Sequence, residues 1–501
     1  MISKVKSQIT KIFATTNGKT VNAGVLNNKL IGQYNLSRKN GPYDSLCNAP
    51  LTNMYFGNKG KVSACCFNRT HLLGSYPEMN IKDIWNSTKA NELRQLLKEN
   101  NLSSGCQSCA SLITKRNYDG VVAKNYDELP IKRDYPSKLE FELSNTCNLE
   151  CKMCFGEFSS LIRKNREKKP PIATPYDKHF VQQIEEFIPH IESTRFFGGE
   201  PFLIDLYYDI WNLIIKLNPS CQIVVQTNGT VLNNRVKNLL SRGNFKINLS
   251  IDSFVKDSYE SIRVNAKYHK VMENIQYFNN YCKDKNTNLG VSACPLTTNW
   301  KELPEMLKAC NNLDAFIYFN VVWYPKELSL SQLPSKKLQE INSYLAKFHF
   351  PDETMVQKSN LQHYNDYNNL IKGWANIAAE KEKKQRKNAK SLAKKERILE
   401  KKLENISAVH LTALFSKKVK FTFEKSNNPA QEKPLNILDG YLDKTNIVFS
   451  RFPHDIRFKK TINTLIEEPD FETVLDVLDN ETEDQIYNRV NELYQQEHHS
   501  K

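Results

Sequence analysis

Residues 139–156 read LEFELSNTCNLECKMCFG, an apolar run followed by three closely spaced cysteines. The run LEFEL has the short alternating pattern of a β-strand, so the loop after this strand carries Cys147, Cys151 and Cys154. With 12 cysteines in 501 residues, the spacing C-x3-C-x2-C is too rare to be expected by chance. Three thiolates on one loop can hold zinc with water as the fourth ligand, or an iron–sulfur cluster in which one iron lacks a protein ligand.

Five further apolar runs follow, separated by helix-like segments such as FVQQIEEFI and LYYDIWNLIIKL. Strands that alternate with helices indicate βαβ units and a parallel sheet or barrel, because parallel neighbours need a crossover. Functional side chains are then expected at the C-terminal ends of the strands. The predicted strands are LEFEL (139–143), TRFFG (194–198), QIVVQT (222–227), KINLSI (246–251), NLGVSA (288–293) and AFIYFNVV (315–322).

Polar residues and glycines stand at these predicted strand ends. Glycines let a ligand approach the backbone closely, a glutamate can accept a hydrogen bond from an ammonium group, and an arginine suits a carboxylate. Taken singly, each motif is more typical of a tight turn, a cap or a surface position. The candidate site residues are Gly198, Gly199 and Glu200 after the second strand, Asn228 after the third, Ser250 and Asp252 at the end of the fourth, and Arg263 beyond it.

Together these motifs resemble the radical SAM superfamily, specifically the branch with SPASM or twitch domains. The resemblance runs from about residue 137 to 325 and rests on CNLECKMC, GGEP, TNGT, SID and the pair Ile262-Arg263, which occur in the order of the family. The fold that it implies is a partial (β/α)6 TIM-like barrel. This α/β fold agrees with the six strands predicted from the hydrophobic pattern.

The resemblance implies a specific cofactor arrangement. Cys147, Cys151 and Cys154 would ligate three irons of a four-iron four-sulfur cluster, and S-adenosylmethionine (SAM) would chelate the fourth. An electron from a flavodoxin- or ferredoxin-type donor would cleave SAM to methionine and a 5′-deoxyadenosyl radical, which abstracts a substrate hydrogen. The residues in contact with SAM would be Gly198, Gly199 and Glu200 at its amino group, Arg263 at its carboxylate, Asn228, Ser250 and Asp252 near the ribose or methionyl part, and Met153, at a position that is often aromatic, near the adenine.

A second set of cysteines precedes the barrel. Cys47, the stretch GKVSACC with Cys65 and Cys66, and the C-x2-C pair of Cys106 and Cys109 can supply the four thiolates of a closed zinc site. The same region, with its IWNS sequence, resembles a twitch or SPASM module, which usually follows the barrel. This resemblance implies that Cys47, Cys65, Cys106 and Cys109 hold an auxiliary iron–sulfur cluster, with the choice between Cys65 and Cys66 open. The cysteines expected to be ordinary buried thiols are Cys221, Cys282, Cys294 and Cys310.

The length of the chain, 501 residues, is too great for one hydrophobic core. No stretch has the pattern of a signal peptide or approaches the ~20 apolar residues of a membrane-spanning helix. We therefore expect a cytoplasmic protein with reduced cysteines and no membrane partner. The predicted division is a polar arm at 1–30, a twitch-like module at 31–115, a linker at 116–136, the radical SAM core at 137–330 and a mostly helical extension at 331–501.

The net charge of +15 is unevenly distributed, since residues 380–404 hold eleven Lys and Arg against five Glu. Such a stretch is typical of a solvated helix, and it also suits a polyanion such as nucleic acid. Within and after this stretch, Leu392, Leu399, Leu403 and Ile406 recur at helical spacing. That stripe predicts contact with a partner helix.

The sequence therefore favours a radical SAM enzyme that modifies a peptide or protein side chain, because related enzymes with SPASM-like modules commonly do so. One alternative is the modification of a nucleic acid or a small metabolite. Another is a non-catalytic, zinc-stabilised nucleic-acid-binding protein. This last hypothesis explains the cysteines and the charge but leaves GGEP, TNGT and SID as coincidence.

Overall fold

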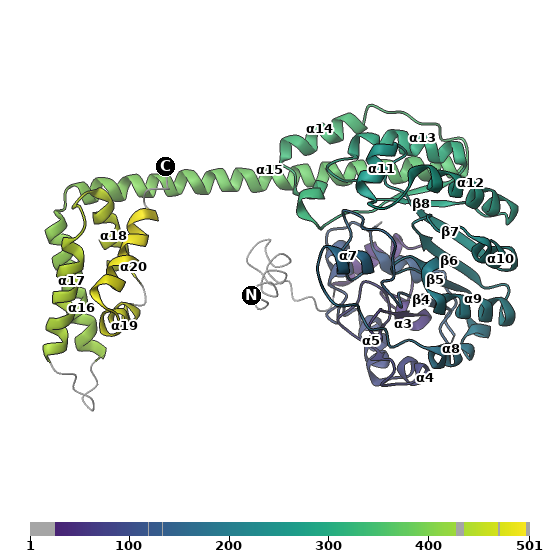
Figure 1. Ribbon diagram of the computed structural model, residues 1–501, viewed down its shortest axis with the longest axis horizontal. Coiled ribbons are helices and arrows are strands. Elements are labelled where there is room, and N and C mark those ends of the chain that lie inside the picture. The colour runs from purple at the N-terminus through teal and green to yellow at the C-terminus, as the bar shows by residue number, and fades with distance from the viewer. Residues whose placement is uncertain (1–25, 119, 133, 427–434, 469–470, 497–501) are drawn as a thin grey trace. The chain divides into compact units, whose positions relative to one another are not determined.

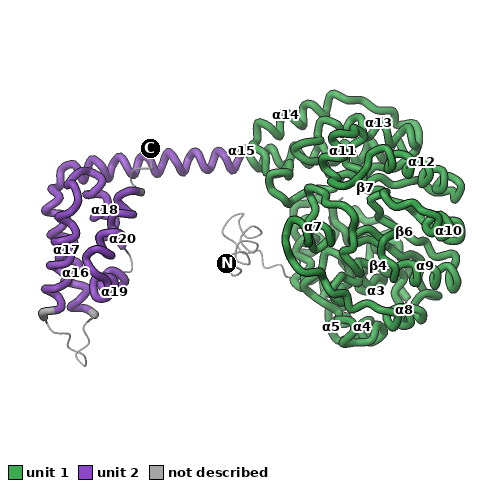
Figure 2. Tube along the Cα trace, in the orientation of Figure 1, with its two compact units in different colours: residues 1–378 green, residues 379–501 purple. Residues whose placement is uncertain are grey.

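The computed structural model describes residues 26–496 apart from 119, 133, 427–434 and 469–470, so most of the predicted N-terminal arm lies outside the described residues. The chain divides into two compact units, residues 1–378 and residues 379–501 (Figure 2). Because the positions of these parts relative to one another are not determined, each unit is described by itself.

The first unit is built on a parallel sheet whose six strands are neighbours in chain order. All six strands predicted from the hydrophobic pattern are confirmed, with ends that differ by a few residues. These strands are β4 (Lys138–Phe141), β5 (Ser193–Phe196), β6 (Gln222–Thr227), β7 (Phe245–Ser250), β8 (Gly290–Ala293) and β9 (Phe316–Phe319).

Helices connect consecutive strands, as expected for (β/α) units. Right-handed crossovers between adjacent strands put every connecting helix on the same face of the sheet, and Figure 1 shows α9 and α10 along the outer side of β5–β7. Residues on the helix-covered face of β6 and β7 are buried, whereas those on the opposite face are partly exposed. Parallel sheets are usually covered on both faces, so this open face is available to a ligand. The helices are α7 (Ser160–Asn165), α8 (Lys178–Glu185), α9 (Asp205–Leu217), α10 (Asn234–Arg242), α11 (Lys256–Ile262), α12 (Tyr268–Asp284) and α13 (Leu303–Leu313).

Aromatic side chains form much of the core between the sheet and these helices. Phe141 and Phe196 stack with their ring centroids 4.8 Å apart, and Phe196 meets Trp211 of α9 edge to face at 5.2 Å. All three are completely buried. Such contacts stabilise the fold beyond the burial of apolar area and fix the helices against the strands.

The N-terminal module extends the same sheet, which the sequence did not predict. Its first strand pairs in parallel with β4 from Asn53↔Lys138 to Phe56↔Phe141, so the nine strands run β3-β2-β1-β4-β5-β6-β7-β8-β9. One hydrophobic core is continuous across the module and the parallel strands. The module strands are β1 (Asn53–Phe56), β2 (Lys61–Ser63) and β3 (Gly74–Ser75).

The helical region that begins at residue 81 in this module is divided into two helices. The hydroxyl of Ser87 accepts a hydrogen bond from the N–H of Ala90 at 3.1 Å and so begins a new helix. Apolar residues of both helices are buried, Ile81 and Leu93 among them. The module helices are α2 (Asn28–Leu36), α3 (Ala49–Thr52), α4 (Ile81–Trp85), α5 (Thr88–Lys98), α6 (Gln107–Thr114) and the 3-10 helix η1 (Val122–Tyr126).

After β9 the chain is helical, with α14 (Ser335–Leu345) followed by the long helix α15 (Met355–Glu404). The buried Asn360 of α15 closes the free edge of β9, since its amide accepts from the N–H of Ile317 at 2.8 Å and donates to the carbonyl of Ala315 at 2.9 Å. An unpaired strand edge invites pairing with other chains. Asn360 therefore ends the sheet on this side.

The second unit is helical, which confirms the predicted class of the C-terminal region. Its core includes Leu403, with Leu399 and Ile406 packed against it. Leu392 is 59% exposed, so the predicted apolar stripe is wrong at that position. Leu392 lies on the part of α15 that precedes the core of the second unit. No helix of the described residues is long and apolar enough to cross a membrane. The helices after α15 are α16 (Ala408–Ser426), α17 (Leu435–Ser450), α18 (Ile456–Ile466), α19 (Glu472–Asn480) and α20 (Glu483–Gln496).

Candidate active site and auxiliary cysteine site

The loop that carries the cysteine triplet is held at both ends by other elements. The N–H of Cys147 donates to the hydroxyl of Ser160 at the start of α7 over 3.1 Å. Further along, the N–H of Lys152 donates to the carbonyl of Ile262 over 2.9 Å. The loop after β4 is therefore fixed between the start of α7 and the end of α11.

Arg263 lies directly beside the triplet. Its Nη1 is 3.9 Å from the Sγ of Cys151, and its Nε is 2.8 Å from Oδ2 of Asp252. The Arg263 residue is 7% exposed and Asp252 is completely buried. The other oxygen of Asp252 accepts a hydrogen bond from the N–H of Cys294 at 2.8 Å. The ends of β7 and β8 thus meet the cysteine loop through one buried ion pair.

The three thiols are poor acids in this setting. Burial raises the pKa of Cys147 to about 11 and that of Cys154 to about 12. Burial also raises the pKa of Cys151, although the charge of Arg263 opposes the shift. These thiols therefore keep their protons near neutral pH until a metal displaces them. A buried set of three sulfurs with a cation beside it fits metal ligation and leaves no fourth thiolate in the motif.

Glu200 lies between the ends of two strands and is held there by three hydrogen bonds. It is completely buried, and its carboxylate accepts hydrogen bonds from the hydroxyl of Thr227 (2.7 Å), the N–H of Asn228 (2.7 Å) and the N–H of Phe202 (3.1 Å). Burial raises its pKa to about 7, against the effect of these donors. The carboxylate thus joins the ends of β5 and β6.

The two glycines before Glu200 make room for the cysteine loop. Gly199 has a φ of 51°, and a Cβ built on it would lie 2.1 Å from the carbonyl oxygen of Thr146, the residue before Cys147. Gly198 has a φ of 82°, and a Cβ built on it would lie 2.8 Å from Cγ of Glu142. The expected close approach therefore occurs, but its partner is the protein backbone. Only glycine fits both the space and the left-handed conformation.

The remaining residues predicted to contact SAM gather around the same loop. The amide of Asn228 donates to Oδ1 of Asn148, the neighbour of Cys147, at 3.0 Å. Ser250 is partly exposed at the end of β7 and accepts a hydrogen bond from Gln226 at 2.8 Å. Met153 packs against the small cluster of Ile262, Leu296 and Val322.

One residue at this site was not recognised from the sequence. Cys294 was expected to be an ordinary buried thiol, as Cys221, Cys282 and Cys310 are. It is only partly buried and follows β8 directly. Burial raises its pKa, and the charges of Asp252, Arg263 and Cys151 lie close enough to affect it as well. Its place immediately after a predicted strand was the signal that could have revealed it.

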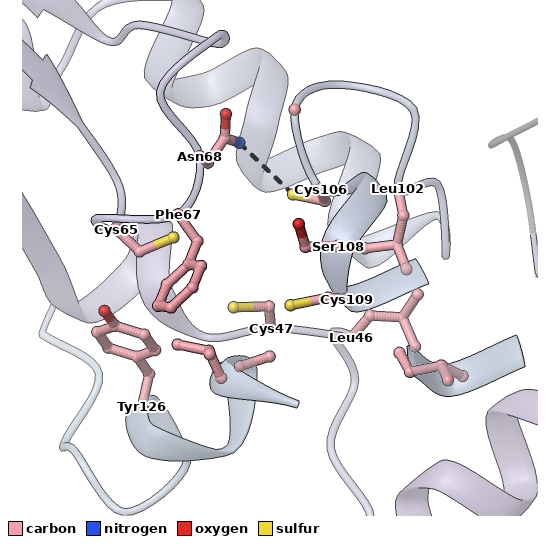
Figure 3. Close-up of a pocket in the computed structure, with 14 residues that line it drawn as sticks. Leu46, Cys47, Cys65, Phe67, Asn68, Leu102, Cys106, Ser108, Cys109 and Tyr126 are labelled. Atoms are coloured by element: carbon pink, nitrogen blue, oxygen red, sulfur yellow. Dashed lines mark hydrogen bonds between the residues drawn. The ribbon is translucent and has the colours of Figure 1, made fainter. Parts of the chain in front are cut away.

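The second cysteine set surrounds a hollow in the N-terminal module. The sulfurs of Cys47, Cys65, Cys106 and Cys109 point into the same space (Figure 3). The hollow has a volume of about 450 Å³, which includes space that is open to solvent. The predicted linker at 116–136 contributes to the hollow, because Val122, Ala123 and Tyr126 of η1 line it.

The neighbouring cysteine faces elsewhere. Cys66 does not line the hollow. Burial raises its pKa to about 12. The other groups that affect this pKa are Glu140, Cys65, Arg195 and Arg69. Glu140 and Arg195 lie on the open face of the sheet. Cys65 is therefore the member of the pair that joins the other three sulfurs.

Donor groups surround these sulfurs. The amide of Asn68 donates to the Sγ of Cys106 at 3.5 Å, and the N–H of Ala49 donates to the Sγ of Cys47 at 3.4 Å. Backbone N–H groups of Phe67 and Asn68 likewise lower the pKa of Cys65, which burial nevertheless raises to about 11. Hydrogen bonds to sulfur are a means of tuning iron–sulfur clusters. In the described part of the chain, no three Cys, His, Asp or Glu side chains meet in the arrangement of a single metal ion.

Comparison with known families matches both regions. Residues 141–310 match the radical SAM superfamily, and residues 47–110 match the iron–sulfur cluster-binding domain named SPASM. The two matches cover the cysteine triplet with its strand ends and the four cysteines around the hollow.

Among curated proteins, the chain is similar to GTP 3′,8-cyclases. It is 31% identical over 142 residues to a probable GTP 3′,8-cyclase of Methanocella arvoryzae and 27% identical over 139 residues to a GTP 3′,8-cyclase of Clostridium botulinum. Each match covers 28% of this chain and 42% of the relative. The chain thus spans less than half of the length of these relatives.

Among solved structures, the chain is similar to anSMEcpe with bound AdoMet, at 21% identity and a TM-score of 0.33. That match covers 42% of this chain and 59% of the other. It is also similar to Streptococcus suis SuiB bound to the precursor peptide SuiA, at 13% identity and a TM-score of 0.32, covering 52% of this chain and 51% of the other.

The family match, the parallel sheet and the cysteine loop at its strand ends define a radical SAM domain at residues 141–310. The SPASM domain at residues 47–110 precedes this radical SAM domain in the chain. The radical SAM domain implies a four-iron four-sulfur cluster and SAM, and the SPASM domain implies auxiliary iron–sulfur binding. Both sets of buried sulfurs fit such groups.

Proposed function

We propose that this chain uses an electron from a flavodoxin- or ferredoxin-type donor to cleave SAM and removes a hydrogen atom from a peptide or protein side chain. The cluster and SAM, when bound, supply the chemistry: one electron breaks the sulfonium bond, giving methionine and a 5′-deoxyadenosyl radical, which takes the substrate hydrogen to form 5′-deoxyadenosine. Cys147, Cys151 and Cys154 would hold three irons of this cluster.

The observation that carries this proposal is the placement of Arg263 beside Cys151 at the strand ends. A guanidinium within 3.9 Å of a ligand sulfur reduces the negative charge that three thiolates bring to a buried site. The same side chain is the one expected at the carboxylate of SAM. Asp252 already pairs with it through Nε, so its Nη atoms are the groups left to face a ligand.

Glu200 and the two glycines then act on SAM indirectly. The Glu200 carboxylate ties the end of β5 to the end of β6, and Gly199 lets the backbone of the cysteine loop pack against them. We therefore assign to these residues the positioning of the loop. Contact with the SAM amino group would come from the exposed backbone beside them.

The open face of the sheet is suited to a polar substrate. Glu142 lies on it and is bound by Arg69 of the module at 3.1 Å, while Gln226 donates to Ser250 across β6 and β7. Arg195 lies in register with Glu140, and its buried Nε has no hydrogen-bond partner among the described residues. Side chains with charges and amides favour a substrate that carries matching polar groups, such as a peptide.

The auxiliary site would complete the enzyme without binding substrate directly. Four cysteines around one hollow can saturate a cluster, which leaves no open iron. The module is joined to the catalytic strands by the pairing of β1 with β4, and its residues Cys66 and Arg69 lie toward the open face. We assign this site to electron transfer or to shaping the substrate cavity.

Different findings bear on the small-metabolite, peptide and zinc-protein hypotheses. The similarity to GTP 3′,8-cyclases supports a small metabolite, although the match leaves out more than half of those relatives. The match to the SPASM domain supports a peptide, because of the substrates common in that branch. The non-catalytic zinc hypothesis has lost its basis, since GGEP, TNGT and SID lie within a matched radical SAM domain.

A labelling experiment tests the peptide proposal. The anaerobically reconstituted protein would be incubated with SAM, dithionite and a small peptide encoded next to its gene, in parallel with GTP. The peptide would carry deuterium on the carbon atoms of its side chains and ordinary hydrogen at its exchangeable positions. Deuterium from this peptide should then appear in 5′-deoxyadenosine. Transfer from deuterated GTP in place of the peptide would overturn the substrate assignment while leaving the SAM chemistry intact.

A further inference from the structure

Six of the eleven cationic residues in the basic stretch of α15 form one continuous stripe of charge. Its members recur at intervals of four and three residues, the spacing that keeps side chains on the same face of a helix. At 100° per residue they fall within an arc of about 80°, and over 18 residues they extend about 27 Å along the axis. The basic stripe consists of Lys383, Lys387, Lys390, Lys394, Arg397 and Lys401.

The stripe is accessible along its length. Every residue from 383 to 398 is exposed, because the helix leaves the core around Ala375 and joins that of the second unit at Leu399. α15 itself is continuous through this region (Figure 1). A rigid helix therefore presents the charges in fixed positions to solvent.

The arrangement differs from that of an ordinary solvated helix. Solvated helices usually mix charges, with Glu four residues before Lys. Between Lys383 and Lys401 no acidic residue falls on the stripe; Glu396 and Glu400 lie at least 60° outside it. Successive stripe residues are instead like-charged neighbours at i, i+3 or i, i+4, which destabilise a helix. A polyanion on this face would remove that repulsion.

We propose that the basic stripe binds the phosphate backbone of a double-stranded nucleic acid. A duplex presents closely and regularly spaced negative charges, and lysines and arginines that neutralise them release counterions. A rigid row of cations about 27 Å long can follow such a backbone without reading bases. The proposal does not depend on the radical SAM chemistry.

Other anionic partners match the stripe less well. The centre of a protein interface needs aromatic or apolar anchors, and the exposed apolar residues here are only Leu392 and Ile398, which point in different directions. A membrane-surface helix needs an apolar face, which these two do not form. Single-stranded nucleic acid is held by stacking on aromatic rings, and residues 381–404 contain none.

The test compares two matched triple variants of the full-length protein. Lys387→Gln, Lys390→Gln and Lys394→Gln remove three stripe charges, whereas the control carries Lys381→Gln, Lys384→Gln and Lys395→Gln on the opposite side. Both lose the same charge, and Gln keeps the helix, which circular dichroism verifies. Binding to a labelled 24-base-pair RNA duplex and to the DNA duplex of the same sequence is measured by fluorescence anisotropy from 50 to 300 mM NaCl.

The parent should bind at least one duplex, with affinity that falls steeply with salt. The stripe variant should bind at least tenfold more weakly at 100 mM NaCl, and the slope of log K against log salt should shrink by about 0.9 for each lost phosphate contact. The control should change less than threefold. Equal losses in the two variants, no duplex binding by the parent, or tighter binding to phosphatidylserine vesicles or polyglutamate than to both duplexes would overturn the proposal.

Discussion

Nη1 of Arg263 lies 3.9 Å from Sγ of Cys151, and Nε of the same side chain pairs with Asp252 at 2.8 Å. One buried cation thus connects the cysteine loop to the end of β7. Both partners of this ion pair are buried. Substituting Arg263 alone, or Arg263 together with Asp252, therefore distinguishes its contribution to stability from its contribution to cofactor binding.

Arg263→Gln should destabilise the protein and weaken SAM binding. The substitution leaves Asp252 as a buried carboxylate without its cation, which typically costs about 3–5 kcal/mol. Unfolding of the metal-free protein by denaturant measures this loss.

The double variant Asp252→Asn with Arg263→Gln provides the control. Removing both charges should recover most of the stability, because no unpaired charge remains. SAM binding, measured by equilibrium dialysis of the reconstituted protein, should stay weak. Recovery of SAM binding together with stability would show that Arg263 serves the fold alone.

The buried carboxylate of Glu200 should make stability depend on pH. Its pKa is raised to about 7 in the folded chain, above the value near 4.3 of an unfolded glutamate. Between these values the folded state holds a proton that the unfolded state has lost, so stability falls as pH rises, by about 1.4 kcal/mol per pH unit.

Glu200→Gln should remove this component. The free energy of unfolding of the variant minus that of the parent should therefore increase from pH 4.5 to 7. The lost hydrogen bond from Asn228 changes this difference by the same amount at every pH. Glu185→Gln, on the exposed side of α8, should keep the pH profile of the parent. Parallel profiles for the parent and Glu200→Gln in thermal unfolding would contradict the buried, raised carboxyl.

Gly199→Ala should displace the cysteine loop. The new Cβ would stand 2.1 Å from the Thr146 carbonyl, and a φ of 51° is unfavourable for alanine. We expect iron content to fall by about one cluster and 5′-deoxyadenosine formation to be lost. The matched control is Gly373→Ala in α15, where nothing lies within 4 Å of an added Cβ; it should leave both measurements unchanged.

The adjacent cysteines of the module should behave differently. Cys65→Ala removes one of the four sulfurs around the hollow and should lower the iron content by about one cluster. Cys66→Ala leaves those four in place and should retain the iron of the parent. Iron and sulfide analysis after anaerobic reconstitution decides the matter; equal loss in both variants would place Cys66 among the ligands.

The hydrophobic pattern was sufficient to predict the six parallel strands, because each run is short, apolar and followed by a helical segment. It did not predict β1, since Asn53–Phe56 has no alternation and its partner β4 lies more than eighty residues away in the chain. Pairing over such separations depends on the complete fold. The two compact units divide at residue 378, inside α15 and directly before the basic stretch that begins at residue 380.

For the site, the sequence located the residues better than their contacts. The motifs identified Gly199 and Glu200, which follow β5, and Arg263, which follows α11 and pairs with Asp252. That Glu200 turns inward, and that Gly199 packs on Thr146, depends on the geometry of neighbouring loops. The same holds for Cys65 and Cys66, which lie in the turn after β2, where only Cys65 lines the hollow.

The central claim is that the loop with Cys147, Cys151 and Cys154 holds the cluster that cleaves SAM. The most direct measurement is the formation of 5′-deoxyadenosine, by mass spectrometry, when anaerobically reconstituted protein is mixed with SAM and dithionite. The parent and Cys66→Ala should form it, and Cys151→Ala should form none. Formation by Cys151→Ala, or none by a parent that contains iron and sulfide, would contradict the account.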